Sequence, residues 1–354
     1  MCAFISANAQ VRVVDALDSM PVSAASAFDA KGNMVGYTRG DGVLSEIKAS
    51  AYPITLRRMG YEQLVIDTPE EKTWQMVPVL FNLPELVVAS EERNAMRQTF
   101  YAREYFSMTA TGDTINFFIE HMAERFIPAS KDSKYEGNPT LRICGSRVYA
   151  NYNMAGEDST AVESETQFPS MLSLMRLPTE EIKAPVSFKA KDNQNKIHEV
   201  KGKSGMSLIH KQNAHSFTTF EDKLAKKKSH SASVWLLKLV GISLKMNQLY
   251  ITHSYPVNEE GVYLPKDLKE ASLVFEADAK GMLIRQMLES DKHMLIRSMV
   301  EVYMVDWEYL TQKEAEEEYA KEKKNAEFII PSSVPPLNEA TRRLVEKANS
   351  GANL

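Results

Sequence analysis

The 354-residue sequence predicts a mainly β protein, with a small N-terminal antiparallel sandwich, a β-rich α+β domain and a C-terminal helix. Short apolar runs separated by turn residues at intervals of roughly 8 to 12 residues predict the sandwich. Runs that alternate apolar with polar residues predict further strands up to residue 310. After residue 310 the chain is rich in charged residues and contains capping signals, which predict helices. A net charge of −5 offers no basic excess for nucleic acid, and no apolar run reaches the length of about 18 residues typical of a membrane helix.

The sandwich is predicted over residues 10–88, from a first strand at 11–15 to a last one within 77–88. Gly42 and Gly60 lie where a turn favours backbone without a side chain. The polar residues 89–97 are predicted to form a linker, so we expect the sandwich to fold on its own.

The order of these segments resembles the carboxypeptidase regulatory-like domain. The similarity is carried by a valine-rich strand ending in Asp15, by Thr38 before Asp41-Gly42, and by Leu56-x-x-x-Gly60-Tyr61-Glu62. The resemblance covers about a quarter of the chain. It implies a seven-stranded, Ig-like and transthyretin-like β-sandwich, which is common in exported proteins of the Bacteroidetes. It names a scaffold and no activity.

The rest of the chain resembles uncharacterised Bacteroidetes envelope proteins, in which such a sandwich precedes a domain of unknown function. This similarity is carried by Tyr101-x-Arg103-Glu104-Tyr105, by Asp113-Thr114 with Phe117-Phe118, and by residues 301–315. It supplies no catalytic residues.

Residues 1–9 are predicted to be the remnant of a signal peptide, because Ala7 and Ala9 suit positions −3 and −1 of a cleavage site before Gln10. A basic segment and a full apolar stretch would then lie upstream of Met1. We expect an exported protein, periplasmic or associated with the outer membrane. The alternative is a cytosolic N-terminus with a chance Ala-x-Ala. Cys2 falls within the remnant and leaves a lipid anchor undecided.

Cleavage would leave Cys144 as the remaining cysteine, so the sequence predicts neither an intramolecular disulfide nor a cysteine-based metal site. Its apolar neighbours Leu141, Ile143 and Val148 predict a buried thiol.

The β-rich domain is predicted over residues 98–310. Asp113 is expected to cap a helix that ends before Pro128, because Ile115, Phe118, Ile119 and Met122 follow it at helical spacing. Predicted strands lie at 99–108, 141–152, 186–190, 197–201, 234–240, 249–253, 273–277 and 294–309, and the last is long enough to require a bend or bulge.

Residues 311–354 are predicted to form a charged helical tail. Thr311 and Glu314 make a capping box for a helix reaching about residue 325, and Asn338 begins a short terminal helix.

Two sets of residues suggest metal binding. His121-x-x-Glu124 matches the zinc-binding pair of metallocarboxypeptidases, but on a helix the two would share a polar face, and no third ligand is evident. His198 and His210 are an even number of residues apart and could align on a strand; with His215, they are predicted to be surface histidines. We therefore predict no metal and no cofactor.

Other residues suggest contact with glycans or lipids. Glu301, Asp306 and Glu308 could supply a glycosidase pair, but are predicted to be solvated sheet residues. Trp235 and Trp307 could stack on sugar, but core positions are favoured. Lys226-Lys227-Lys228, with Lys223 and His230, is predicted to be a hairpin tip that could touch anionic lipid.

The sequence therefore predicts no catalytic residue. It favours a non-catalytic binding protein of the cell envelope that has a protein or glycan partner, with peripheral outer-membrane association left open. The alternative is a periplasmic hydrolase acting on peptide or glycan, which a metal or an acid-lined cleft would favour.

Overall fold

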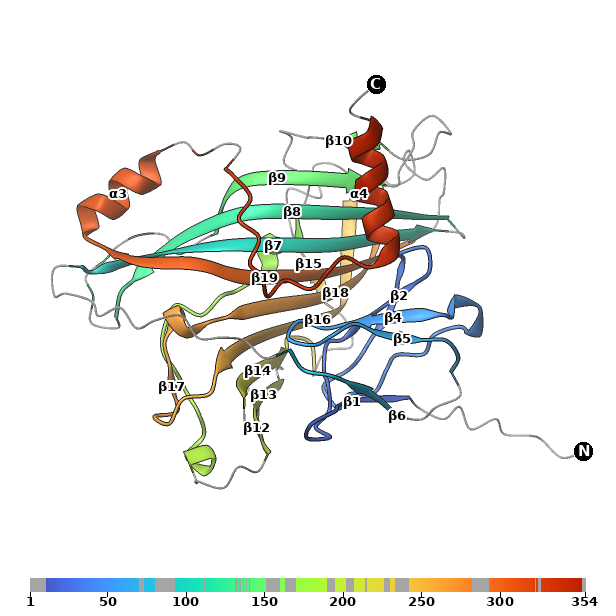
Figure 1. Cartoon of the computed structure of the whole chain (residues 1–354), viewed down its shortest axis with the longest axis horizontal. Coiled ribbons are helices and arrows are strands. Elements are labelled where there is room, and N and C mark those ends of the chain that lie inside the picture. The colour runs from blue at the N-terminus through green and yellow to red at the C-terminus, as the bar shows by residue number, and fades with distance from the viewer. Residues whose placement is uncertain are drawn as a thin grey trace, which may run out of the picture.

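The computed structural model confirms a mainly β protein, whose strands form an N-terminal sandwich and one very large sheet (Figure 1). The residues that it describes are 11–69, 73–79, 93–110, 113–130, 133, 135, 137, 139, 141–150, 160–162, 170–189, 195–201, 207–213, 215–225, 230–232, 242–281, 293–321, 323 and 326–351.

Six described strands form the sandwich. One sheet pairs the first and last of them in parallel, and the other is antiparallel with the order β3-β2-β4-β5. Val13, Ala27, Leu56 and Met76 are buried between the two sheets. The strands are β1 (Arg12–Asp15), β2 (Ser26–Asp29), β3 (Met34–Tyr37), β4 (Ile54–Arg57), β5 (Leu64–Ile66) and β6 (Thr73–Met76), with a 3₁₀ turn η1 (Ala49–Ala51) before β4.

The large sheet is antiparallel and has eleven strands, in the order β10-β9-β8-β7-β19-β18-β16-β14-β13-β12, with β15 beside β16. Its strands are β7 (Ala95–Ala110), β8 (Asp113–Pro128), β9 (Arg142–Ala150), β10 (Thr160–Val162), β12 (Lys196–Lys201), β13 (Ser207–Gln212), β14 (Ser216–Asp222), β15 (His230–Ala232), β16 (Ile242–Pro256), β18 (Glu270–Gly281) and β19 (Met294–Leu310).

Smaller elements complete the described fold. The helices α3 and α4 lie at opposite ends of the large sheet (Figure 1). The elements are the paired strands β11 (Ile182–Lys183) and β17 (Val262–Tyr263), the 3₁₀ turns η2 (Met171–Leu174), η3 (Val186–Lys189) and η5 (Pro265–Asp267), and the helices α3 (Gln312–Ala320) and α4 (Glu339–Gly351).

The helix predicted over residues 113–127 is wrong, because this segment forms β8. The strand is buried on both faces: Ile115 and Ile119 pack on one side, and Phe118 and Met122 on the other. A strand buried on both faces lacks the apolar–polar alternation by which a strand is recognised. Its apolar residues therefore matched helical spacing by coincidence.

Most other predicted elements agree with the structure. Strands are present at 99–108, 197–201, 249–253 and 273–277, and at all described residues of 141–152 except Leu141. The long strand at 294–309 has the expected bulge, between Met304 and Asp306. Glycines 42 and 60 have the positive φ angles that favour glycine, +76° and +79°.

The helix signals of the tail are also confirmed. Thr311 and Glu314 form the capping box, and Asn338 Oδ1 accepts a hydrogen bond from the Thr341 amide at 2.8 Å. The first helix is shorter than predicted and ends at Ala320.

Two further predictions need correction. The predicted strand at 186–190 is the 3₁₀ turn η3 over its described residues, and β7 begins at Ala95, inside the predicted linker. Residues 1–10, 80–92, 226–229 and 233–241 lie outside the described part of the chain. The signal remnant, the closing part of the seventh strand, most of the linker, the lysine cluster and Trp235 fall among them.

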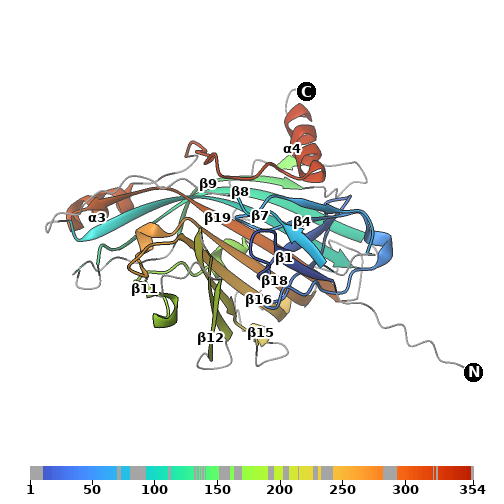
Figure 2. The same ribbon diagram turned by 60° about the horizontal axis from the view of Figure 1, so that its bottom comes forward.

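The two faces of the large sheet have different contacts. Along β7, Phe100, Ala102 and Phe106 point to the larger apolar core, which we call the core face. Tyr105 points to the side that carries the sandwich and α4, which we call the sandwich face. Figure 2 shows the sandwich lying across the middle strands of the sheet.

Side chains on the sandwich face form rows across neighbouring strands. One row is mainly aromatic, and the sandwich residues Phe28, Met34 and Tyr37 pack against it together with Ala348 of α4. Its members, in order of strand pairing, are Tyr250, Val274, Met299, Tyr105, Phe118 and Tyr149.

The next row alternates in charge, with Glu301, Arg103, Glu120 and Arg147 as successive partners on β19, β7, β8 and β9. Arg57, the last residue of β4, donates two hydrogen bonds of 2.8 Å to the Glu301 carboxylate. The Arg57 side chain is 1% exposed and that of Glu301 is 0% exposed. A bidentate ion pair therefore joins the sandwich to the sheet where both groups are removed from water.

We expect Arg57→Met to lower the free energy of unfolding by about 3 to 5 kcal/mol, because it leaves the Glu301 carboxylate buried without its partner. Adding Glu301→Gln should cost less than the sum of the two single changes, as measured by urea denaturation in a double-mutant cycle. Arg39→Met, which removes an exposed ion pair, should cost under about 1 kcal/mol. Equal small losses from Arg57→Met and Arg39→Met would contradict this account.

A second buried carboxyl lies on the core face. Glu104 of β7 is 0% exposed, and it accepts hydrogen bonds from Ser170 Oγ at 2.7 Å, from the Met171 amide at 3.0 Å and from Ser298 Oγ at 3.2 Å. Burial nevertheless raises its pKa from 4.5 to about 7. The folded protein therefore holds this proton between about pH 4.5 and pH 7, where the unfolded chain has lost it.

The contribution of Glu104 to stability should therefore fall as the pH rises through this window. Relative to Glu104→Gln, the wild-type protein should lose on the order of 3 kcal/mol between pH 5 and pH 8. Urea denaturation of both proteins at the two pH values measures this difference. A difference that does not change with pH would show that burial does not hold the proton on Glu104.

Candidate binding pocket

The structure separates the pair that suggested zinc. His121 and Glu124 are three residues apart on a strand and so point to opposite faces. His121 lies on the core face with its Nδ1 2.7 Å from Ser146 Oγ, and burial lowers its pKa to about 4. Across the described residues, no group of three histidine, cysteine, aspartate or glutamate side chains is placed to hold a metal ion.

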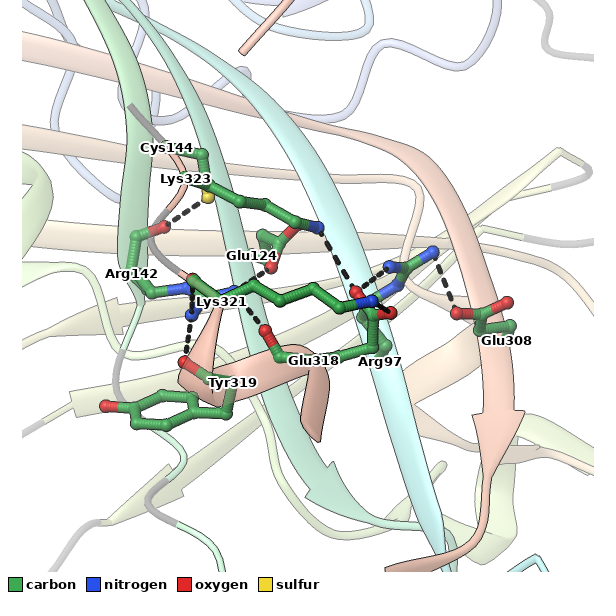
Figure 3. A network of polar contacts seen from close by, with 9 residues as sticks. All are labelled: Arg97, Glu124, Arg142, Cys144, Glu308, Glu318, Tyr319, Lys321 and Lys323. Atoms are coloured by element: carbon green, nitrogen blue, oxygen red, sulfur yellow. Dashed lines mark hydrogen bonds and ion pairs between the residues drawn. The ribbon is translucent and has the colours of Figure 1, made fainter. Parts of the chain in front are cut away.

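Glu124 belongs to a network that holds α3 on the sheet (Figure 3). Its carboxylate accepts hydrogen bonds from Arg142 at 2.6 Å and from Lys323 at 2.5 Å. Arg97 of β7 bridges Glu308 at 2.7 Å and Glu318 at 3.4 Å. These contacts join the helix to four strands, so the network serves to attach α3.

Cys144 lies beside this network (Figure 3) and is buried, as predicted, with its Sγ 3.5 Å from the Arg142 carbonyl oxygen. Burial raises the pKa of the thiol, which lowers its reactivity.

His198 and His210 are register partners on β12 and β13, as their even spacing allowed. The prediction that both are surface residues is wrong for His210, which is buried with its ring 5.5 Å from that of Phe217. Burial lowers its pKa. His215 lies apart from both, in the turn before β14.

The three acidic residues of β19 were predicted to be solvated, which is wrong for Glu301, since it is 0% exposed. Glu301 is bound by Arg57 and Glu308 by Arg97, whereas Asp306 is exposed and accepts from the Trp307 amide at 2.8 Å. Trp307 is half-buried, beneath the Lys266 ammonium at 5.5 Å.

A cavity of about 420 Å³ lies where the sandwich meets the large sheet. This volume is within the range of small-ligand sites, about 300 to 1,000 Å³. We call it the junction pocket. Its lining comes from the sandwich segments 15–23, 58–61 and 78–79, and from residues within 211–218, 254–257 and 269–270 at the ends of the sheet strands.

The sheet side of the pocket is one polar row. Lys211, Thr218, Ser254 and Glu270 are successive register partners on β13, β14, β16 and β18. This row runs beside the charged row that binds Arg57. The docked sandwich therefore covers a row of polar side chains. A row of apolar side chains would have packed against the sandwich and left no cavity.

Two cations of the pocket have no carboxylate partner among the described residues. Arg58, which is 5% exposed, donates from Nε to the Ser23 carbonyl at 2.8 Å and from Nη1 to the Met59 carbonyl at 2.7 Å. Lys211 Nζ donates to the Pro21 carbonyl at 2.8 Å and to Ser23 Oγ at 2.9 Å. Burial, with the nearby charge of Arg58, lowers the pKa of Lys211 to about 8.

The acids of the pocket differ in how far their oxygens are satisfied. Asp15 accepts from the Leu17 amide at 2.7 Å and from the Tyr61 hydroxyl at 2.9 Å. Asp18 accepts from the Met20 amide at 2.7 Å, and burial raises its pKa. These two carboxylates thus shape the β1–β2 connection, and neither is within ion-pair distance of Arg58 or Lys211.

The sequence analysis did not identify this site. Of its lining residues, His215 was predicted to be a surface histidine, and Arg58 and Glu270 were not singled out. One signal was present: Arg57 and Arg58 interrupt an otherwise apolar strand end, and charged residues in such a position are buried only when they have partners.

No family model matches this chain, and no curated protein matches it. Among solved structures, it is similar to the YwiB protein from Bacillus subtilis, with a TM-score of 0.16 and 5% identity over 59% of this chain and 94% of that one. A putative AttH protein from Nitrosomonas europaea has a TM-score of 0.17 and 11% identity, over 63% of this chain and 54% of that one. Similarity at this level carries no argument about fold or function.

Among the described residues, no helix has the length and apolar character needed to cross a membrane.

Proposed function

We propose that this protein is a non-catalytic binding protein of the cell envelope, which holds a small anionic ligand in the junction pocket. The observation that carries the proposal is a pair of cations, the buried Arg58 and the half-buried Lys211, which line the cavity and are held by carbonyl and hydroxyl oxygens. Neither has a carboxylate within 4.0 Å among the described residues.

A buried charge is costly unless it is paired. A guanidinium has five N–H donors and an ammonium has three, and two of each are occupied by the bonds described. Both cations converge on Ser23, Arg58 at its carbonyl and Lys211 at its hydroxyl. An anion bound beside Ser23 would therefore meet two fixed positive charges and several free donors.

The envelope location rests on the sequence. Ala7-Asn8-Ala9-Gln10 suits a signal-peptide cleavage site, and the resemblance of the sandwich to the carboxypeptidase regulatory-like domain suggests an exported protein. In this proposal, the sandwich forms one wall of the ligand site.

The alternative, a hydrolase, is favoured by one contact. Ser23 Oγ lies 2.9 Å from the Lys211 ammonium, and the next residue, Ala24, has a φ of +58°, a strained value for a residue other than glycine. A serine beside a lysine of lowered pKa is a known nucleophile–base pair. Ser23 Oγ would attack an acyl carbon and pass its proton through Lys211 to the leaving group, and water would release the acyl group. Against this role, Lys211 also donates to the Pro21 carbonyl, so the lysine anchors the loop.

We expect small carboxylates such as succinate to bind the wild-type protein, as measured by isothermal titration calorimetry. Arg58→Gln and Lys211→Met should each weaken binding by roughly tenfold or more, because each removes a charge-assisted hydrogen bond. Arg39→Gln changes an exposed arginine outside the pocket and should bind like wild type. Binding that is absent from the wild type, or unchanged in both pocket variants, would refute the anion site.

The two candidate functions differ in their dependence on Ser23. If the protein only binds, hydrolysis of a p-nitrophenyl ester should be no faster with the wild type than with Ser23→Ala, and a fluorophosphonate probe should leave Ser23 unlabelled. A burst of p-nitrophenol that Ser23→Ala abolishes would favour the hydrolase instead.

A further inference from the structure

Two carboxyls of the junction pocket have an oxygen without a hydrogen-bond partner among the described residues, Asp18 and Glu270, and of these Asp18 is half-buried and Glu270 fully buried. Glu270, the first residue of β18, is 3% exposed, and its Oε2 is buried without a hydrogen-bond partner among the described residues. It lies on the sandwich face, because its neighbours Ala271 and Leu273 point to the core face. An unsatisfied buried carboxyl oxygen is rare in a folded protein and calls for an explanation.

The groups around Glu270 allow its carboxyl to accept a further hydrogen bond. Ser254 is its register partner and a hydrogen-bond donor to it, and the positive charge of Arg58 favours its ionised form. Burial, with the repulsion of Glu301, raises its pKa to about 7. Near neutral pH it exchanges between carboxylate and carboxylic acid, and a cationic donor would favour the ionised form.

Lys211 and Glu270 lie at the two ends of the polar row. Three strand spacings of about 4.8 Å place the backbones of Lys211 and Glu270 roughly 14 Å apart. Both side chains line the cavity and shorten this gap. The hydroxyls of Thr218 and Ser254 lie between them in the same row. An extended chain advances about 3.3 to 3.6 Å per residue, so two or three residues would span what remains.

We propose that the ligand of the junction pocket is a zwitterionic short peptide, with its carboxylate at Arg58 and Lys211 and its ammonium at the free oxygen of Glu270. The inference rests on the proposed function and adds the second charge of the ligand. The hydroxyls of Thr218 and Ser254 are placed to bond the peptide groups between the two ends.

The test uses three tripeptides on the full chain at pH 7.5: trialanine, N-acetyl-trialanine and trialanine amide. Calorimetry on the wild type should show the tightest binding for trialanine. Acetylation removes the ammonium and amidation removes the carboxylate, and each should weaken binding by roughly tenfold or more. These comparisons do not depend on whether any variant folds.

Substitutions test whether Glu270 is the residue that binds the ammonium of the peptide. Glu270→Gln should bind trialanine and N-acetyl-trialanine with equal affinity, because the variant has no charge for the ammonium. Glu104→Gln is the matched control, since Glu104 is a buried carboxyl of similar pKa outside the pocket. It should keep the wild-type preference for trialanine.

The outcomes distinguish this inference from the function on which it rests. If N-acetyl-trialanine and succinate bind as tightly as trialanine, and do so through Arg58, the anion site stands and the zwitterion inference is wrong. If trialanine is preferred but Glu270→Gln retains the preference, the ammonium lies elsewhere and the inference is also wrong. If neither succinate nor any tripeptide binds, both proposals are refuted.

Discussion

The ion pair between Arg57 and Glu301 fixes how the sandwich lies on the large sheet, and the junction pocket depends on that placement. A bidentate arginine–carboxylate pair restrains both distance and orientation, and here both partners are buried. The guanidinium also lies 5.0 Å from the Tyr105 ring centroid and donates to the Pro336 carbonyl at 3.0 Å. One arginine thus joins the sandwich, the sheet and the segment that leads into α4.

The neighbouring residue has a different role. Arg57 is neutralised by Glu301, whereas Arg58 is held by carbonyl oxygens and lines the cavity. Two consecutive arginines at the end of β4 therefore divide between attachment and ligand binding. Because the backbone joins them, any shift of the sandwich that strained the first would also displace the second from Lys211 and Glu270 on the sheet.

Most strands and both helix starts of the tail could be predicted from the sequence, whereas the prediction failed at β8, which is buried on both faces. The capping box at Thr311 and the strand at 197–201 gave local signals that no tertiary contact overrode. The segment that became β8 is covered by the core on one face and by Tyr105 and Tyr149 on the other, so its pattern carried no alternation. No local rule could distinguish it from a buried helix.

The candidate site was out of reach of the sequence for another reason. Arg58 directly follows β4, whereas Lys211 and Glu270 belong to β13 and β18, far away in the chain, and only the sheet register places the last two in one row. Motif searches favoured residues close in sequence, such as His121 and Glu124. These two lie on a strand and therefore point to opposite faces of the sheet. A site whose residues are brought together by the pairing of distant strands has no characteristic spacing in the sequence, so a motif search cannot find it.

Unpaired charges at the junction also link ligand binding to the docking of the sandwich. Arg58 and the Ser23 hydroxyl belong to the sandwich, whereas Lys211 and Glu270 belong to the sheet. A ligand that satisfied groups on both sides would bind only when the two are together, so it would stabilise the docked state in proportion to the logarithm of its concentration over its dissociation constant. Without ligand, the cost of burying Glu270 with an incomplete set of partners opposes docking, whereas the Arg57–Glu301 pair, the hydrogen bonds of Lys211 to Pro21 and Ser23, and the aromatic row favour it. In addition to lining the site, the sandwich would therefore respond to the ligand, because its docking on the sheet would be more stable when the pocket is filled.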